Sequence, residues 1–202
     1  MALTYIIGGK IVLPEAVIEG KALAFSQETG KIEGIVDTVP AGAKTIDACG
    51  NYVAPGLVDI HIHGYLGEDT CDAKPEGIKK MAYGVAENGV TAFLPTTMTE
   101  SMDTIKKALE SIRACMEKSK DWKGSVVLGA HAEGPFISPS KKGAQALEYI
   151  LKPDAKFVKE YADIIRIISL APETDTEDFE ALREIRRDTD VIMSMGHTSA
   201  DY

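Results

Sequence analysis

The chain has 202 residues, of which 45% are hydrophobic and 26% are charged, an ordinary composition for a globular protein. Its 22 basic and 31 acidic side chains give a net charge of −9. Because an acidic surface disfavours contact with a phosphate backbone, we expect no nucleic-acid partner.

The three cysteines, Cys49, Cys71 and Cys115, form no CxxC pair. This spacing argues against a disulfide framework and a cysteine-based zinc site, and it favours a reducing cytoplasm. The first residues, MALTYIIGGKIVLP, have neither a positively charged start nor a small-residue cleavage site, so we predict no signal peptide. No apolar run approaches the ~20 residues of a spanning helix, so we expect a cytoplasmic protein with no membrane partner.

Residues 1–52 have the pattern of short strands separated by turns, as in TYIIGGKIVLP, ALAFSQETGKIEGIV and KTIDACGNYVAPG. The segment SQETGK lies between two apolar runs and predicts a hairpin. No helical period occurs here. We therefore predict a small β domain over residues 1–52.

Residues 53–202 change to an alternation of apolar strands and longer amphipathic segments. The expected strands are LVDIHIH, GVTAFLPTT, SVVLGAHAE, IIRIISLAPE and VIMSMGHT. The expected helices are PEGIKKMAYGVAEN, SMDTIKKALESIRACMEKS, PDAKFVKEYAD and DTEDFEALREIRRDT. This alternation predicts βα units and a parallel sheet.

A doubly wound sheet would accommodate these strands, but the polar residues at their carboxyl ends favour a (β/α)₈ barrel, where the active site forms at those ends. A closed barrel needs eight strands and ~250 residues. We therefore expect residues 53–202 to form an α/β catalytic domain that is an incomplete barrel of about five strands, within a longer protein.

All four histidines of the sequence fall near predicted strand ends. Residues two apart on a strand point to the same face, so His61 and His63 are expected to project together, as are His131 and Glu133. His197 follows an apolar strand. Imidazole and carboxylate ligands without thiolate suit Zn²⁺, Fe²⁺, Mn²⁺ or Co²⁺, and such a metal lowers the pKa of bound water to about 7.

Simpler interpretations exist for each residue alone. An HxH pair often only makes hydrogen bonds, Glu133 could pair with a lysine, and His197 could cap a helix or lie in the core. The occurrence of all four histidines at strand ends favours the metal site over these alternatives.

The segments APGLVDIHIHG, GVTAFLPTTMT, GAHAEGPFISPSKKGAQ, LAPE and GHTSADY occur in an order that closely resembles the N-acetylglucosamine-6-phosphate deacetylases, a family of the amidohydrolase superfamily. HxH alone would suit any amidohydrolase, whereas HAEGPFISPSKKGAQ is specific to this branch. The resemblance implies a metal-dependent hydrolase-type barrel that hydrolyses the acetamide of N-acetylglucosamine 6-phosphate to glucosamine 6-phosphate and acetate. It also implies a homodimer for the full-length protein.

By this resemblance, Glu133 holds the catalytic metal and can bridge to a second ion. His197 is a ligand of the same metal, and His61 and His63 bind the other. Some members lack this pair and work with one metal, so its presence favours two.

His131 matches the family block without being a ligand, so its expected place is behind the ligands. Ala144, through its backbone, and Gln145 are expected to lie against the amino sugar, although many relatives have histidine at the position of Gln145. The family's catalytic aspartate and its remaining metal-binding histidine are expected beyond Tyr202. The small β domain, a β-sandwich in the family, takes further strands from the C-terminal end.

Two alternatives remain open. The chain could be another amidohydrolase, dihydroorotase-like or D-aminoacylase-like. It could also be an inactive truncated fragment.

Overall fold

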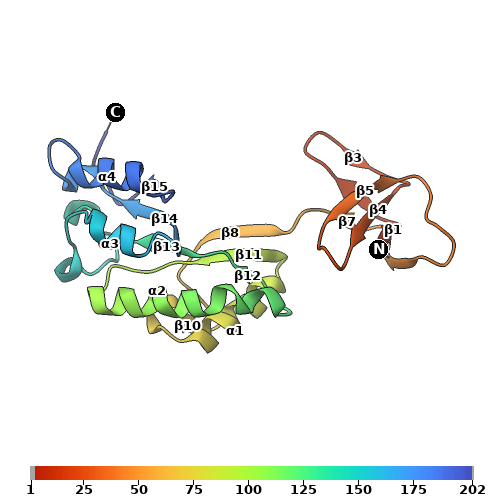
Figure 1. Ribbon diagram of the computed structural model, residues 1–202, viewed down its shortest axis with the longest axis horizontal. Coiled ribbons are helices and arrows are strands. Elements are labelled where there is room, and N and C mark those ends of the chain that lie inside the picture. The colour runs from red at the N-terminus through yellow and green to blue at the C-terminus, as the bar shows by residue number, and fades with distance from the viewer. Residues whose placement is uncertain (1–2, 202) are drawn as a thin grey trace. The chain divides into compact units, whose positions relative to one another are not determined.

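The computed structural model describes residues 3–201, and the chain divides into two compact units, Met1–Pro55 and Gly56–Tyr202 (Figure 1). Met1, Ala2 and Tyr202, which fall within the predicted domain ranges, lie outside the described residues. Each unit has its own hydrophobic core.

The first unit consists of short strands in two sheets, with no helix among its described residues. The sheets have the strand orders β5-β4-β1-β6 and β3-β2-β7. The strands are β1 (Leu3–Ile7), β2 (Lys10–Val12), β3 (Val17–Ile18), β4 (Ala22–Ser26), β5 (Ile32–Val36), β6 (Lys44–Asp47) and β7 (Tyr52–Val53).

Strands β4 and β5 pair antiparallel, so the predicted hairpin around SQETGK is confirmed. In its turn, the backbone N–H of Thr29 donates to the Ser26 hydroxyl at 3.2 Å. The core of this unit is small and is centred on the buried side chains of Tyr5, Ala22 and Ala24.

Parallel strands and helices alternate in the second unit, as predicted. Strand β11 pairs with β8 and β12, and β14 pairs with β13 and β15, all in parallel. The strands are β8 (Leu57–Ile62), β9 (Gly64–Tyr65), β10 (Glu68–Asp69), β11 (Val90–Pro95), β12 (Val126–Val127), β13 (Ala130–Glu133), β14 (Ile165–Leu170) and β15 (Ile192–Met195). The short strands β9 and β10 form an antiparallel hairpin.

Each predicted helix is present, and polar or proline caps define where several of them begin. Pro75 opens α1, and the Ser101 hydroxyl accepts from the Thr104 N–H at the start of α2. The Asp154 carboxylate caps α3 in the same way. The helices are α1 (Pro75–Ala86), α2 (Met102–Met116), α3 (Ala155–Glu160) and α4 (Glu180–Asp188), with 3₁₀ turns η1 (Thr70–Asp72), η2 (Lys118–Asp121), η3 (Pro139–Lys141), η4 (Leu147–Tyr149) and η5 (Pro172–Thr174).

Helices α1 and α2 pack against each other on one side of the strands β8, β11 and β12 (Figure 1). Apolar side chains of α2 such as Ile105, Leu109 and Ile112 are fully buried with Phe93 of β11. This burial of one helix face against the sheet fixes the strands whose carboxyl ends carry the histidines.

The segment SVVLGAHAE, predicted as one strand, is divided into β12 and β13 at Gly129. Gly129 has φ 150°, and a Cβ there would lie 2.4 Å from the Ile164 carbonyl oxygen. The prediction of a continuous strand was wrong because the chain passes too close to its neighbour for a side chain. A bridge between Thr96 and His131 continues the parallel arrangement from β11 to β13.

Strands β8 and β15 are the outer strands of their sheets and expose apolar side chains. Leu57, Val58 and Ile60 of β8, and Ile192 and Met195 of β15, are all more than half exposed. No helix within residues 3–201 combines the length and apolar character needed to cross a membrane.

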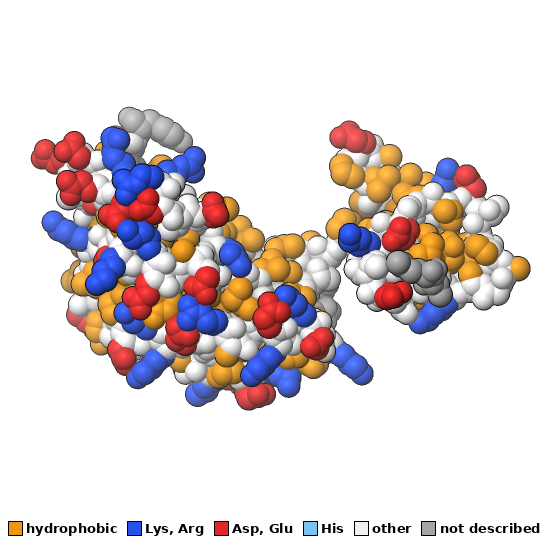
Figure 2. Space-filling view, viewed as in Figure 1, with side chains coloured by type: hydrophobic (Ala, Val, Ile, Leu, Met, Phe, Trp, Pro, Cys, Tyr) orange, Lys and Arg blue, Asp and Glu red, His pale blue; other side chains and the backbone are white. Residues whose placement is uncertain are grey.

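Figure 2 shows acidic and basic side chains interspersed over the visible face of the second unit. Ion pairs within the second unit include Lys106–Glu160 and Arg113–Asp163.

Candidate metal centre

The four histidines lie at or next to the carboxyl ends of parallel strands. His61 belongs to β8 and His63 follows it directly, while His131 and Glu133 belong to β13. His197 follows β15 after one glycine, with φ 49°. Since the carboxyl ends of parallel strands meet at one edge of a sheet, residues far apart in sequence come together here.

Three imidazoles converge on the carboxylate of Glu133, whose side chain is only 5% exposed. The Nε2 atoms of His61 and His63 lie 2.8 and 3.0 Å from Oε2 of Glu133, and 3.2 Å from each other. Nε2 of His197 contacts the other oxygen, Oε1. The ligand atoms of His61, His63 and Glu133 lie within 4.8 Å of one another, close enough to hold a metal ion.

Backbone carbonyls determine where two of these rings carry their protons. Nδ1 of His63 donates to the Thr96 carbonyl oxygen at 3.2 Å, and Nδ1 of His197 donates to that of Lys141 at 2.9 Å. In a neutral ring, the Nε2 lone pair then faces Glu133, which also only accepts. Such an arrangement requires a cation, either a proton on the ring or a metal ion.

Two further observations fit a divalent metal. Oε2 of Glu133 is buried and has no partner with hydrogen-bond geometry, although two Nε2 atoms lie within 3.0 Å. In known metal sites, histidine ligands commonly donate their other N–H to a backbone carbonyl, as His63 and His197 do here. The residues present therefore match the ligands of a metal site, with nitrogen and oxygen donors and no thiolate.

The histidines also determine the ionisation of the carboxylate. Burial alone would raise the pKa of Glu133, but the close contact and charge of His63, together with His61 and His197, lower it to about 2. Conversely, the close contact with the Glu133 carboxylate raises the pKa of His63 above its ordinary value of 6.5, against the opposing effect of burial. Each group stabilises the charged form of the other.

His131 lies behind the cluster and links three strands. Its Nδ1 donates to the Ile60 carbonyl of β8, and its Nε2 accepts from the Ser169 hydroxyl of β14, both at 2.8 Å. Burial, the largest effect, lowers the pKa of His131. The ring packs edge-on against His61, with centroids 4.7 Å apart, but neither of its nitrogens is free to bind a metal. That His131 is not a ligand stays a prediction, which this geometry favours.

Gln145 is buried and holds the carboxylate of Glu133. Its Nε2 donates to Oε1 of Glu133 at 3.0 Å, and its Oε1 accepts from the backbone N–H of Thr99 at 2.6 Å. Because the Thr99 N–H only donates, the amide orientation is fixed. The neighbouring Ala144 is exposed. The structure thus brings Gln145, but not Ala144, into the cluster.

The turn after Glu133 requires glycine. Gly134 has φ 69°, and a Cβ there would lie 2.0 Å from the Thr99 hydroxyl oxygen. This close approach lets residues 134–145 return across the strand ends, where the Ser138 N–H donates to the His197 carbonyl at 2.9 Å.

Sequence reasoning missed the partners that orient the ligands. The carbonyls of Thr96 and Lys141 have no signature in the sequence, since every residue carries one. The Ser169 hydroxyl could have been found, because it stands immediately before the LAPE segment at another strand end.

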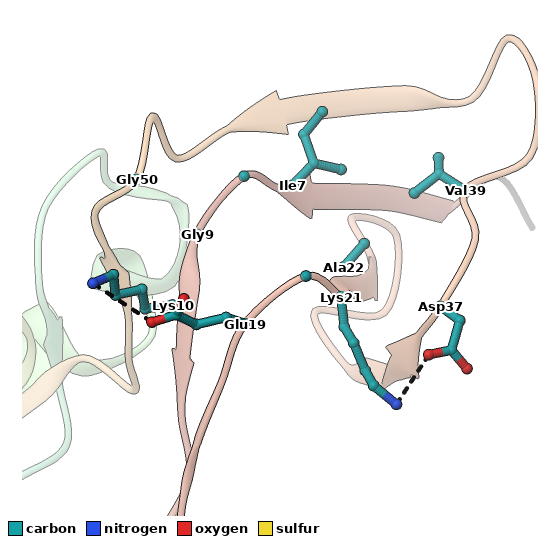
Figure 3. Close-up of a pocket in the computed structure, with 11 residues that line it drawn as sticks. Ile7, Gly9, Lys10, Glu19, Lys21, Ala22, Asp37, Val39 and Gly50 are labelled. Carbon is teal, nitrogen blue, oxygen red and sulfur yellow. Dashed lines mark ion pairs between the residues drawn. The ribbon is translucent and has the colours of Figure 1, made fainter.

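Apart from the histidine cluster, a pocket lies in the first unit and has a volume of about 370 Å³ (Figure 3). Its charged side chains pair with one another, Lys10 with Glu19 at 3.5 Å and Lys21 with Asp37 at 3.0 Å. These pairs leave no convergent set of ligands comparable to that around Glu133.

Parallel strands flanked by helices, with histidines and a carboxylate at the strand ends, define the fold of a metal-dependent hydrolase. The sequence profile of the Amidohydrolase family matches residues 52–202, and the chain belongs to that family.

Particular relatives share more than the fold. The chain is 40% identical over 159 residues to an N-acetylglucosamine-6-phosphate deacetylase of Bacillus subtilis (strain 168), covering 73% of this chain and 38% of the relative. It is 29% identical over 171 residues to an N-acetylgalactosamine-6-phosphate deacetylase of Escherichia coli O157:H7, covering 83% of this chain and 44% of that relative. The crystal structure of N-acetylglucosamine-6-phosphate deacetylase from Pasteurella multocida matches with a TM-score of 0.81 and 29% identity, covering 98% of this chain and 52% of that one. The chain thus spans about half or less of the length of these relatives.

Proposed function

We propose that this chain carries part of the active site of a metal-dependent deacetylase that hydrolyses the acetamide of N-acetylglucosamine 6-phosphate. The products would be glucosamine 6-phosphate and acetate. The observation that carries the proposal is the convergence of His61, His63 and His197 on the buried Glu133. The named relatives supply the substrate class.

The ligand arrangement supports a site for one or two divalent ions, zinc, iron, manganese or cobalt. His61 and His63 face one oxygen of Glu133 and His197 faces the other, which supports a carboxylate that would be shared between two ions. A divalent metal held there would activate water and polarise the amide carbonyl.

The remaining roles belong to the protein groups themselves. The carbonyls of Thr96 and Lys141 keep the protons of His63 and His197 on Nδ1, which leaves both Nε2 atoms free to act as ligands. Gln145 fixes the carboxylate plane of Glu133. The exposed backbone at Ala144 is available to the amino sugar.

Other parts of the proposal concern the whole protein. The aspartate that transfers the proton, and a further metal-binding histidine, would lie outside residues 1–202. The strands β8 to β15 would belong to a (β/α)₈ barrel, and residues 1–52 to a β-sandwich. We propose a cytoplasmic homodimer for that whole protein, and little or no activity for the 202-residue chain alone.

A second candidate substrate is the epimer N-acetylgalactosamine 6-phosphate, because one relative is named for it. Both sugars carry the same acetamide, so the metal centre would act alike on either. Contacts to the sugar ring decide between them.

The first test is the substitution Glu133→Gln, which removes the anionic ligand and nearly preserves its shape. Elemental analysis should show loss of the metal, and Glu148→Gln, an exposed residue in the following loop, should leave it unchanged. Unchanged metal content in Glu133→Gln would contradict the assignment.

Substrate is tested on the longest form of the protein that carries this sequence. Acetate release is measured with both acetamido sugar phosphates, a cyclic amide and an N-acyl-D-amino acid. Turnover of the cyclic amide or the acylated amino acid alone would favour a dihydroorotase-like or D-aminoacylase-like enzyme.

A further inference from the structure

The segment that carries His197 leaves strand β15 through an unusual backbone conformation. Gly196 N–H donates to the Leu170 carbonyl at the end of β14, at 3.1 Å. His197 itself has φ 49°, in the left-handed region that residues with side chains rarely adopt. Such a residue keeps this conformation only when its surroundings hold it there.

Glu173 binds both residues that follow His197. It lies in η5, just beyond the end of β14, the strand next to β15. One carboxylate oxygen, Oε2, accepts from the Thr198 hydroxyl at 2.5 Å. The other, Oε1, accepts from the backbone N–H and the hydroxyl of Ser199 at 2.7 and 2.9 Å. Hydrogen bonds to a carboxylate are stronger than neutral ones.

These bonds persist over the working pH range. Desolvation opposes ionisation of the exposed Glu173, but the donors from Thr198 and Ser199 outweigh it and lower the pKa to about 2. The carboxylate is therefore charged at neutral pH.

His197 itself is bound by the loop 134–145. Its carbonyl accepts from the Ser138 N–H, and its Nδ1 donates to the Lys141 carbonyl, both at 2.9 Å. The loop 134–145 thus binds His197 itself, whereas Glu173 binds the two residues after it. Together they fix the backbone on either side of the left-handed residue.

We infer that Glu173 is a positioning residue of the metal centre: by binding Thr198 and Ser199 it holds His197 in the conformation that turns Nε2 toward Glu133. Glu173 contacts none of the ligand atoms. The inference rests on the proposed metal centre. It gives a role to Glu173, the glutamate of the LAPE segment, for which the sequence alone suggested none.

The experiment compares Zn²⁺ affinity in four proteins, measured by competition with a chromophoric chelator. Glu173→Ala should bind Zn²⁺ about 10- to 100-fold more weakly than the parent, the range known for groups that orient metal ligands. Glu173→Gln should lose less, since its remaining oxygen still accepts from Ser199. Glu177→Ala, an exposed residue of the same connection, should bind like the parent.

A second measurement needs no metal. Long-range ¹H–¹⁵N correlation spectra of the metal-free protein report which ring nitrogen of His197 carries the proton. The parent should show the Nδ1–H form, and Glu173→Ala should show a mixture. If Glu173→Ala fails to fold by circular dichroism, Thr198→Val combined with Ser199→Ala removes two of the three donors and should weaken Zn²⁺ binding in the same direction.

The outcomes separate this inference from the function on which it rests. A parent that binds no Zn²⁺ would overturn the proposed function, and the His197 spectra would then decide the role of Glu173. Equal Zn²⁺ affinity and equal His197 spectra in the parent and the Glu173 or Thr198/Ser199 variants would overturn the inference.

Discussion

Nε2 of His63 lies 3.0 Å from Oε2 of Glu133, and each group shifts the ionisation of the other. The pKa of His63 is raised above 6.5, mainly by its close contact with the Glu133 carboxylate, and the pKa of Glu133 is lowered from 4.5 to about 2. In the metal-free protein this pair therefore contributes to stability over a limited pH range.

The pH dependence of this stabilisation follows from the direction of each pKa shift. The contribution of His63 is complete below pH 6.5 and is lost as the pH rises through its raised pKa. That of Glu133 is complete above pH 4.5 and is lost as the pH falls toward 2. We expect the parent to exceed Glu133→Gln in free energy of unfolding most strongly between pH 4.5 and 6.5, by on the order of 3 kcal/mol. Urea denaturation across pH measures this difference, and a difference that stays constant from acid to alkaline pH would contradict it.

The histidine pair at the end of β8, His61 and His63, should control part of the metal content. Replacing both His61 and His63 by Asn removes two nitrogen ligands and should lower the number of ions per chain, while the Glu133 carboxylate remains. Elemental analysis after gel filtration gives the count. Equal content in variant and parent would mean that these rings only make hydrogen bonds.

His131→Asn is the matched control for that experiment. His131 packs edge-on against His61, but its two ring nitrogens are taken up by Ile60 and Ser169, which leaves neither free to bind a metal. Its loss should therefore reduce stability by about 1–3 kcal/mol, the cost of leaving buried polar groups without partners, and leave the metal count unchanged.

Gln145 should matter for stability as well as for activity. Gln145→Leu leaves the Thr99 N–H and one oxygen of Glu133 without their buried partner, which should cost about 1–3 kcal/mol in the free energy of unfolding. Gln27→Leu, where the amide is exposed and meets only Lys44, should change little. A raised KM with unchanged stability in Gln145→Leu would instead indicate that the amide serves the substrate.

The exposed apolar side chains of the outer strands should cause the 202-residue chain to self-associate. Leu57, Ile192 and Met195 are each more than 60% exposed, and an outer strand also presents backbone groups for pairing. Sedimentation equilibrium should show oligomers, and Ile192→Lys with Met195→Lys should reduce them. A monodisperse monomer of the parent would refute this.

The strands and the ligand candidates were predictable because they follow simple periodic rules. Alternation of two along β8 places His61 and His63 together, and the carboxyl-end rule brings them to Glu133. The break at Gly129 was not predictable, since it accompanies a close approach to the Ile164 carbonyl, in the turn just before β14. The hydrogen bond from Gln145 to Glu133 was missed for the same reason: it depends on how the loop after β13 folds back over the strand ends, which is a tertiary contact.

The left-handed conformation of His197 also bears on how the cluster assembles. Its partners come from segments that precede it by as many as 64 residues, and those segments are joined to one another by the pairing of β13 with β14 and by the Ala171 N–H, which donates to the Phe136 carbonyl. No short peptide excised from this chain could reproduce the geometry. During synthesis the cluster can therefore form only after β15 and the residues that follow it have left the ribosome and docked against β14.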